Sequence, residues 1–288
     1  MKKIGIIVNN RKDSDFLYLK QIITSLVQDG FVPVLTLEQK SNVVSDKCVF
    51  TSIEEMFKCS SVVIILGGDG TFLNVADLAV RYGVALLGVN LGTLGYLAQL
   101  DKTDIDKITT ILKSDYKIQN RMMITARVYR NNKIVYEYSA LNDAVITRSA
   151  VLKPVHIDLL GETGRIANYF CDGLIFSTPT GSSAYSLSVG GPVMDPSMEA
   201  ILVSAISPHS LTGHSLVFDP HKALGCKVNS PKTVNALISV DGRHVFYLQQ
   251  DDKIEITKND KYLKLIQLTD TDFYTVLKRK FSLRGQKI

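Results

Sequence analysis

The stretch SVVIILGGDGT, from Ser61 to Thr71, decides how the rest of the chain is organised. Its apolar run, Val62 to Leu66, is too short for a typical helix and is rich in β-branched residues. That pattern is typical of a strand buried on both faces of a parallel sheet. Glycines follow at once, and the apolar periodicity from Phe72 to Val80 then predicts a helix. The stretch therefore predicts a strand–turn–helix unit of an α/β domain.

The turn Gly67-Gly68-Asp69-Gly70 combines glycines with a carboxylate. Glycines let backbone N–H groups approach an anion, and a helix start adds positive potential. A carboxylate would repel a phosphate unless it had its own task, such as holding a divalent metal or accepting a hydroxyl proton. Taken alone, the turn fits a phosphate site and a surface turn about equally well. It is not a dinucleotide fingerprint, because Leu73 occupies the third glycine position, and it does not match the P-loop.

The totals of the chain fit a globular protein of two domains. It has 288 residues, of which 45% are hydrophobic and 21% charged. The net charge of +5 mildly favours anionic ligands and gives no case for nucleic acid. Without an apolar run of membrane-spanning length or a signal peptide, we expect a cytoplasmic protein that does not enter the membrane. The widely spaced cysteines, with no C-x-x-C pair, predict buried reduced thiols: Cys48, Cys59, Cys171 and Cys226.

The first part of the chain alternates predicted strands and helices, which indicates a Rossmann-like α/β domain with a parallel sheet over residues 1–118. Strands are expected over 4–8, 31–35, 62–66 and 84–89, and helices around 16–27, after the capping box Ser52–Glu55, and over 103–112. A second glycine-rich turn, GVNLGTLGY, runs from Gly88 to Tyr96 at the end of a predicted strand. Since ligands of open α/β sheets bind outside the carboxyl ends of the strands, both glycine-rich turns favour a site there.

The second part alternates apolar and polar residues with period two, which predicts a β-rich, sandwich-like domain over residues 119–264. Asn131-Asn132 and Asp241-Gly242 are expected to close hairpins. A helix is predicted over 272–280, so residues 265–288 are expected to rejoin the first domain. We expect the ligand in a crevice between the domains.

A second constellation of polar residues lies between Thr178 and Tyr185, where four hydroxyls fall within six residues. The pattern suits either a polar ligand or the N-terminal cap of a helix. Asp172 and the pair Asn142-Asp143 are the other polar groups in apolar surroundings. Asn and Asp side by side suit sugar hydroxyls and the amide edge of a base, and also ordinary turns.

Six motifs together resemble the bacterial NAD kinase family. They are GGDGTFLN (67–74), GVNLGTLGYL (88–97), LNDAVITR (141–148), DGLIFSTPTGSSAYSLSVGGP (172–192), SPHSLT (207–212) and SVDGR (239–243). The match covers most of the chain in the family's order, although GGDG alone is shared with lipid kinases and 6-phosphofructokinases. The resemblance implies an α/β N-terminal domain, a β-rich C-terminal domain and a homodimer or homotetramer.

The resemblance also implies a reaction, in which the γ-phosphoryl group of ATP moves to the 2′-hydroxyl of the adenosine ribose of NAD and makes NADP. Asp69 would accept the proton of that hydroxyl or mainly orient it, because phosphoryl transfer demands positioning and charge neutralisation more than a strong base. Gly67, Gly68, Gly70 and Thr71 would line the phosphates of ATP. Mg²⁺ or another divalent metal would offset the transferred charge, with no protein ligand assigned to it.

The positions that match the family's NAD contacts lie mostly in the second domain. Asn142-Asp143 would hold the adenosine, residues 183–185 would pack on the dinucleotide, and Asp172 would lie beside the nicotinamide half. The full set implied for NAD is Asp69, Gly70, Asn142, Asp143, Lys153, Asp172, Thr180, Ser183, Ala184, Tyr185, Ser188 and Arg243.

The chain departs from the family pattern at four of these motifs. Asp143 replaces the Glu of the Asn-Glu pair, Cys171 the first Gly of GDG, Ser183 the Thr of GSTAY and Arg243 the Gln of DGQ. The departures bear on affinity and on the choice between NAD and NADH, and none removes Asp69.

Two other functions use some of the same residues. A lipid or sugar kinase shares GGDG, but the hydroxyl-rich 178–185 segment suits a polar substrate better than a lipid. A sensor that binds NAD(P) without catalysis would have no evident need for Asp69 among phosphate-binding glycines.

Overall fold

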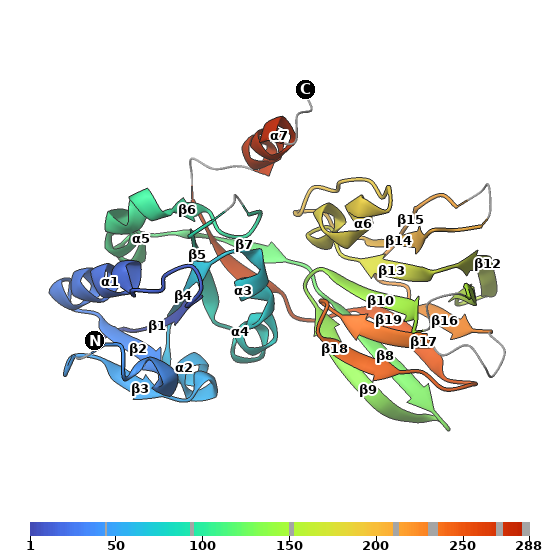
Figure 1. The fold of residues 1–288 in the computed structure, drawn as a ribbon, viewed down its shortest axis with the longest axis horizontal. Helices are drawn as coiled ribbons and strands as arrows, with labels where there is room; N and C mark the ends of the chain where they lie inside the picture. The colour runs from blue at the N-terminus through green and yellow to red at the C-terminus, as the bar shows by residue number, and fades with distance from the viewer. Residues whose placement is uncertain are drawn as a thin grey trace. The chain divides into compact units, whose positions relative to one another are not determined.

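The computed structural model describes residues 1–43, 45–92, 95–149, 153–209, 213–229, 236–268 and 273–283. The chain divides into two compact units. One is built from Met1–Asn120 with Leu263–Ile288, and the other is Arg121–Tyr262 (Figure 1).

The first unit is built on an eight-stranded sheet in the order β3-β2-β1-β4-β5-β20-β7, with β6 paired to β5. The strands are β1 (Lys3–Val8), β2 (Val32–Thr36), β3 (Val49–Thr51), β4 (Val62–Gly67), β5 (Ala85–Asn90), β6 (Leu100–Asp101), β7 (Lys117–Arg121) and β20 (Leu263–Gln267). β4 lies between β1 and β5 and is parallel to both. Its apolar residues are at most 2% exposed, as expected for a strand covered on both faces.

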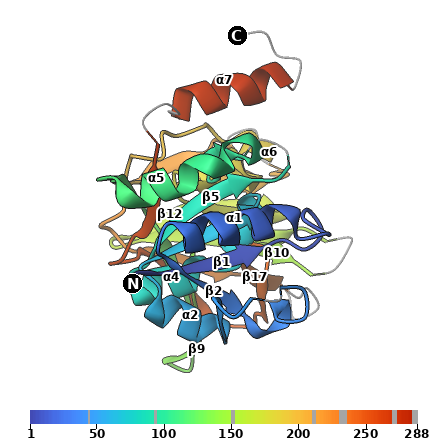
Figure 2. The same cartoon turned by 90° about the vertical axis from the view of Figure 1, so that its left-hand side faces the viewer.

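Helices cover the two faces of this sheet (Figure 2). α1 (Leu17–Gln28) lies with the 3₁₀ segment η2 (Lys102–Lys107) and α5 (Ile108–Lys113), while α2 (Ile53–Cys59) packs with α4 (Ala76–Tyr82). One half of the capping box predicted for α2 is present, since the Ser52 hydroxyl accepts the backbone N–H of Glu55 at 3.2 Å, while the Glu55 carboxylate pairs with Lys58. Two further helical segments are η1 (Leu37–Gln39) and α7 (Phe273–Leu283), the helix predicted near the end of the chain.

The helix predicted over 72–80 is interrupted. It forms α3 (Asp69–Leu73) and α4, because Val75 adopts φ −128° and ψ 0° between them. Val75 is β-branched, has a low helix propensity and is 2% exposed, so burial of its side chain outweighs an unbroken helix. The helix predicted over 103–112 likewise begins as η2 and becomes α-helical only at Ile108.

The second unit contains two six-stranded sheets, both antiparallel. One has the order β15-β14-β13-β10-β17-β18 and the other β12-β11-β16-β19-β8-β9. Their strands are β8 (Ile124–Arg130), β9 (Lys133–Ala140), β10 (Asp143–Arg148), β11 (Val155–Gly161), β12 (Gly164–Cys171), β13 (Gly173–Ser177), β14 (Ile201–Ile206), β15 (Leu216–Phe218), β16 (Leu224–Val228), β17 (Ala236–Val240), β18 (His244–Tyr247) and β19 (Lys253–Lys258). Side chains of both sheets share one apolar core, which makes the predicted sandwich.

The hairpins predicted from turn residues are present. Asn131 and Asn132 join β8 to β9 at φ 53° and 60°, and Asp241 and Gly242 join β17 to β18 at φ 49° and 67°. Such left-handed turns match the twist of the flanking strands. Among the cysteines, which are all unpaired, Cys171 and Cys226 are buried as predicted, whereas Cys48 and Cys59 are only half-buried.

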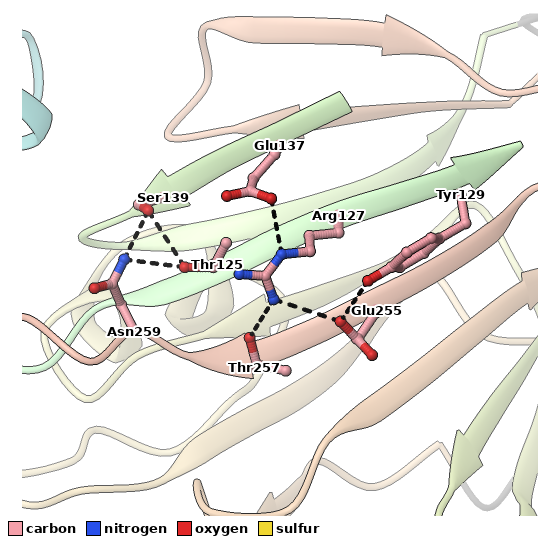
Figure 3. Close-up of polar contacts among 8 residues, drawn as sticks. All are labelled: Thr125, Arg127, Tyr129, Glu137, Ser139, Glu255, Thr257 and Asn259. Atoms are coloured by element: carbon pink, nitrogen blue, oxygen red, sulfur yellow. Dashed lines mark hydrogen bonds and ion pairs between the residues drawn. The ribbon is translucent and has the colours of Figure 1, made fainter. Parts of the chain in front are cut away.

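The outer face of the β12-β11-β16-β19-β8-β9 sheet carries a polar network (Figure 3). Ile124, Ala126 and Val128 of β8 point into the core, so the alternate residues of the strand face outward. Arg127 donates to Glu137 at 2.8 Å, to Thr257 at 3.2 Å and to Glu255 at 3.4 Å across neighbouring strands. These groups pair with one another, which indicates that this face stabilises the sheet.

Candidate functional site

The GGDG turn stands at the carboxyl end of the central strand. β4 ends at Gly67, Gly68 is in extended conformation, and α3 begins at Asp69. The backbone N–H of Thr71 donates to the Gly68 carbonyl at 2.8 Å. A Cβ atom on Gly67 would fall 2.3 Å from Oγ1 of Thr71, so this turn can close only with glycine there.

The second glycine-rich turn fixes the carboxylate of the first. Oδ2 of Asp69 accepts the backbone N–H of Tyr96 at 2.9 Å, and Oδ1 accepts that of Leu97 at 3.1 Å. Gly95 permits this approach, because a Cβ atom there would lie 2.1 Å from Oδ1. An ionised carboxylate has about four lone-pair positions, so two bonds leave Asp69 able to accept a substrate hydroxyl. Thr93 and Leu94 of this turn lie outside the described residues.

The last helix contacts the same turn. Nζ of Lys280 lies 3.8 Å from the centre of the Tyr96 ring, and the Phe273 ring lies 5.9 Å from it. α7 therefore packs on the residue whose backbone N–H holds Asp69.

In the second unit, a buried aspartate organises the Asn142-Asp143 pair. The Asp241 carboxylate accepts the backbone N–H groups of Leu141 at 2.9 Å, Asn142 at 2.8 Å and Asp143 at 3.1 Å. The sequence predicted Asp241 to lie in a hairpin turn within the motif SVDGR and assigned it no contact with Asn142 or Asp143. Its second role depends on contacts across about a hundred residues, which no local pattern reveals.

Burial changes the titration of both carboxyl groups. Burial, and then the neighbouring charge of Asp241, raise the pKa of Asp143 to about 7. Burial also raises the pKa of Asp241, although the three backbone N–H groups and Arg243 act in the opposite direction. Asp143 is 6% exposed. A carboxyl group of this kind can meet a ligand hydroxyl either as acceptor or, when protonated, as donor.

The hydroxyl-rich segment joins the Asn142-Asp143 turn at one end of the β10–β13 pair. Asp143 lies opposite Ser177 in the sheet, and the backbone N–H of Thr178 donates to the Asn142 carbonyl at 2.9 Å. A Cβ atom on Gly181 would lie 2.1 Å from the Asn142 carbonyl oxygen. The fold thus brings these two sequence motifs together.

Two hydroxyls of this segment hold the backbone. The Thr178 hydroxyl donates to the Leu141 carbonyl and accepts the N–H of Gly181, and the Ser182 hydroxyl donates to the Pro179 carbonyl and accepts the N–H of Met194. For these two residues the capping interpretation of the motif is the better one.

The remaining residues of the segment differ in exposure. Thr180 is buried, and its Oγ1 accepts from Arg121 at 3.4 Å. Ser183 and Ala184 are half-buried. Tyr185, which is 43% exposed, and Ser188 face solvent. They lie in η3 (Gly181–Ser183) and α6 (Tyr185–Ser188) or, for Ala184, between these helices.

Asp172 is not grouped with these residues. It pairs with Arg148 at 2.7 Å, at the end of β10 opposite to Asp143. Arg148 lies five positions along the strand from Asp143, a distance of roughly 17 Å. Lys153 and Arg243 are exposed, and Arg243 follows the turn that carries Asp241.

In the described part of the chain, no group of three or more His, Cys, Asp or Glu is placed to hold a metal ion. None of the described helices is long and apolar enough to span a membrane.

Family models match both units of the chain. Residues 4–116 match the ATP-NAD kinase N-terminal domain, and residues 141–268 match the ATP-NAD kinase C-terminal domain. The chain is 34% identical to the NAD kinase of Ruminiclostridium cellulolyticum over 288 residues, which is 100% of both chains. It is 35% identical to the NAD kinase of Caldanaerobacter subterraneus subsp. tengcongensis over 285 residues, 99% of this chain and 100% of the relative.

Solved structures with the same fold bear related names. Yeast NADH kinase complexed with NADH superposes with a TM-score of 0.90 and 22% identity, over 100% of this chain and 89% of the other. An NAD kinase from Archaeoglobus fulgidus in complex with ATP superposes with a TM-score of 0.74 and 19% identity, over 99% of this chain and 98% of the other. Given the family matches over both units and the full-length relatives, the chain belongs to the NAD kinase family.

Proposed function

We propose that this protein is an ATP-dependent NAD kinase that makes NADP. The γ-phosphorus of ATP forms a bond to the 2′-oxygen of the adenosine ribose, its bond to the β,γ-bridging oxygen breaks, and ADP leaves. The proton of the 2′-hydroxyl passes to the Asp69 carboxylate. Family membership favours this reaction over the lipid kinase, sugar kinase and sensor alternatives.

The observation that carries the proposal is the double hydrogen bond that fixes Asp69. Backbone N–H groups hold both oxygens of the carboxylate within the glycine-rich turn, so its orientation is set before the substrate arrives. Such positioning accelerates a reaction whose loose transition state needs an oriented nucleophile and neutralised charge. Gly67, Gly68, Gly70 and Thr71 line the phosphates in this proposal.

A divalent metal, Mg²⁺ in the first instance, belongs to the proposal. Magnesium sites of phosphoryl-transfer enzymes take much of their coordination from substrate phosphates and water, and we assign it to these rather than to a protein cage. When bound, the metal would neutralise charge on the phosphates.

The NAD contacts are proposed residue by residue. Asn142 and Asp143 hold the adenosine. Because the pKa of Asp143 is raised to about 7, its carboxyl group can bind a ribose hydroxyl as an acceptor or, when protonated, as a donor. Asp69 and Gly70 also contact NAD, at the hydroxyl that is phosphorylated. The other contacts that we propose are Lys153, Asp172, Thr180, Ser183, Ala184, Tyr185, Ser188 and Arg243.

We also propose a homodimer or homotetramer that works in the cytoplasm. Exposed apolar side chains of β9 and β18 support a partner surface: Ile134 is 51% exposed, Val245 52% and Tyr247 66%. Light scattering after size-exclusion chromatography would give the subunit number, and a monomer at micromolar concentration would contradict this part of the proposal.

A coupled assay for NADP with purified protein, ATP, Mg²⁺ and NAD tests the function. NADP formation supports it. Phosphorylation of diacylglycerol in place of NAD would establish a lipid kinase, and NAD binding with no ATP consumption at any metal concentration would establish a sensor.

Asp69→Asn tests the role of the carboxylate. We expect activity to fall by about 10²-fold or more while the fold and NAD binding persist. Asp77→Asn is the matched control, because Asp77 is an exposed carboxylate on α4 paired with Arg81. Unchanged turnover in Asp69→Asn would remove Asp69 from its role.

A further inference from the structure

Lys12 lies at the GGDG turn, although nothing in its sequence context singled it out. A Cβ atom on Gly68 would lie 2.9 Å from Nζ of Lys12, and one on Gly92 would lie 2.6 Å from it. Gly68 follows β4 and Gly92 follows β5, the neighbouring parallel strand. The ammonium group therefore occupies the space that two missing side chains leave open at the carboxyl ends of adjacent strands.

The loop that carries Lys12 is anchored on both sides. Before it, the backbone N–H of Asn9 donates to the Leu66 carbonyl at 2.8 Å, and the Asn9 side chain donates to Oγ1 of Thr71 at 3.5 Å. After it, the 4%-exposed Asp13 accepts the N–H of Leu19 at 3.0 Å at the start of α1. The backbone of Lys12 is thus held against the GGDG turn while its side chain reaches across the glycines.

No carboxylate of the described residues pairs with Lys12. Among the residues that the structure describes, its ammonium group has neither an ion-pair nor a hydrogen-bond partner. A cation held over glycines, whose missing side chains leave room for a ligand, is an arrangement that can bind phosphate oxygens.

We infer that Lys12 binds a phosphate oxygen of the phosphoryl donor over Gly68 and Gly92, as a binding group of the reaction proposed above, on which this inference rests. An ammonium group there attracts the triphosphate of ATP and neutralises charge that develops as the bond to the γ-phosphorus breaks. Glycine is needed at positions 68 and 92 because a larger side chain would push the ammonium group away.

Lys12→Met tests the inference. We expect kcat/KM for ATP to fall by roughly 10- to 100-fold, by analogy with other charge-stabilising groups, while KM for NAD changes less than about twofold. Lys12→Arg keeps a cation and should restore part of the loss. Arg11→Met is the matched control, since it removes the same charge from the same exposed loop at a residue outside these glycine contacts.

Gly92→Ala gives a second test that leaves the lysine in place. The new Cβ meets the flexible end of Lys12, and Gly92 has no left-handed backbone, so the fold should melt as the wild type does. The displaced ammonium group should still weaken kcat/KM for ATP. Wild-type kinetics in both Lys12→Met and Gly92→Ala, or an equal loss in Arg11→Met, would overturn the inference.

Calorimetry with inorganic tripolyphosphate separates this inference from the proposed function. We expect Lys12→Met to bind tripolyphosphate at least about tenfold more weakly than wild type, with a smaller dependence on salt. If the wild-type protein made no NADP but this difference held, the proposed function would fail and the phosphate site would stand. If it made NADP and Lys12→Met bound tripolyphosphate and ATP normally, the site would fail and the function would stand.

Discussion

Oδ1 of Asp241 accepts the backbone N–H of Asn142 at 2.8 Å, although 99 residues separate them in the chain. The same carboxylate also accepts the N–H groups of Leu141 and Asp143. Asp69 holds Tyr96 and Leu97 in the same manner in the other unit. In each unit, a buried or half-buried aspartate joins two loops through backbone N–H groups.

Replacing the Asp241 carboxylate should affect stability and NAD binding together. In Asp241→Asn the amide presents N–H groups where the Leu141 N–H needs an acceptor, so we expect a loss of about 1–3 kcal/mol of unfolding free energy. KM for NAD should rise about tenfold or more and KM for ATP much less, because the displaced loop carries Asn142. Urea unfolding and initial-rate kinetics measure both. Asp219→Asn is the control, since Asp219 accepts a backbone N–H in an exposed turn.

The raised pKa of Asp143 predicts how stability depends on pH. Its folded pKa is about 7 against an ordinary value of 3.8, so the folded state binds the proton more tightly between these values. The stabilisation is complete below about pH 3.8 and is lost as pH rises through 7. Asp143→Asn removes this dependence on pH. The unfolding free energy of the variant, relative to that of wild type, should therefore be higher at pH 8 than at pH 5, by on the order of 2 kcal/mol. An equal difference at both pH values would contradict the prediction.

Gly95→Ala should disable the kinase while leaving the fold intact. The added Cβ would lie 2.1 Å from Oδ1 of Asp69, so the carboxylate has to leave its two N–H donors. We expect kcat to fall by about 10-fold or more, with a smaller change in KM for NAD. Because both act through one carboxylate, Gly95→Ala combined with Asp69→Asn should be no slower than Asp69→Asn alone. Additive losses would show that Gly95 acts elsewhere.

Arg127→Met should lower stability and leave the kinetics unchanged, the reverse of the result expected for Gly95→Ala. Arg127 contacts Glu137, Glu255 and Thr257 on the outer face of the sheet (Figure 3). Because the two glutamates are partly exposed, we expect the unfolding free energy to fall by only about 1 kcal/mol. Kinetic constants should not change. Arg165→Met is the control, because Arg165 is 64% exposed and lies 3.7 Å from Asp158. A change in KM for ATP or NAD would assign this face a part in catalysis.

Local patterns predicted most of the elements and the central motif. The β-branched run of β4, the Ser52 cap, the asparagine and Asp-Gly hairpin turns and the period-two strands depend on neighbours in sequence, which is why they could be identified. Family motifs added the sites, whose contacts with substrate stay predictions.

What could not be predicted depends on distant pairs. The role of Asp241 arises from a loop about a hundred residues away, and Lys12 in the run Asn-Asn-Arg-Lys has the composition of any solvated loop. The break at Val75 comes from tertiary packing that overrides helical periodicity. The split among hydroxyls, with Thr178 and Ser182 holding backbone, likewise depends on which carbonyls the fold brings near.

The position of β20 has a consequence for how the chain folds as it leaves the ribosome. This strand lies between β5 and β7, so the first unit's sheet has a vacant place until residues 263–267 have been synthesised. Residues 121–262, although later in the chain, can complete their own core first. The first unit is therefore finished last. In a nascent chain that stops short of β20, β6 still pairs with the end of β5, but the part of β5 around Leu86 has no neighbour on that side and forms an edge on which other chains can aggregate.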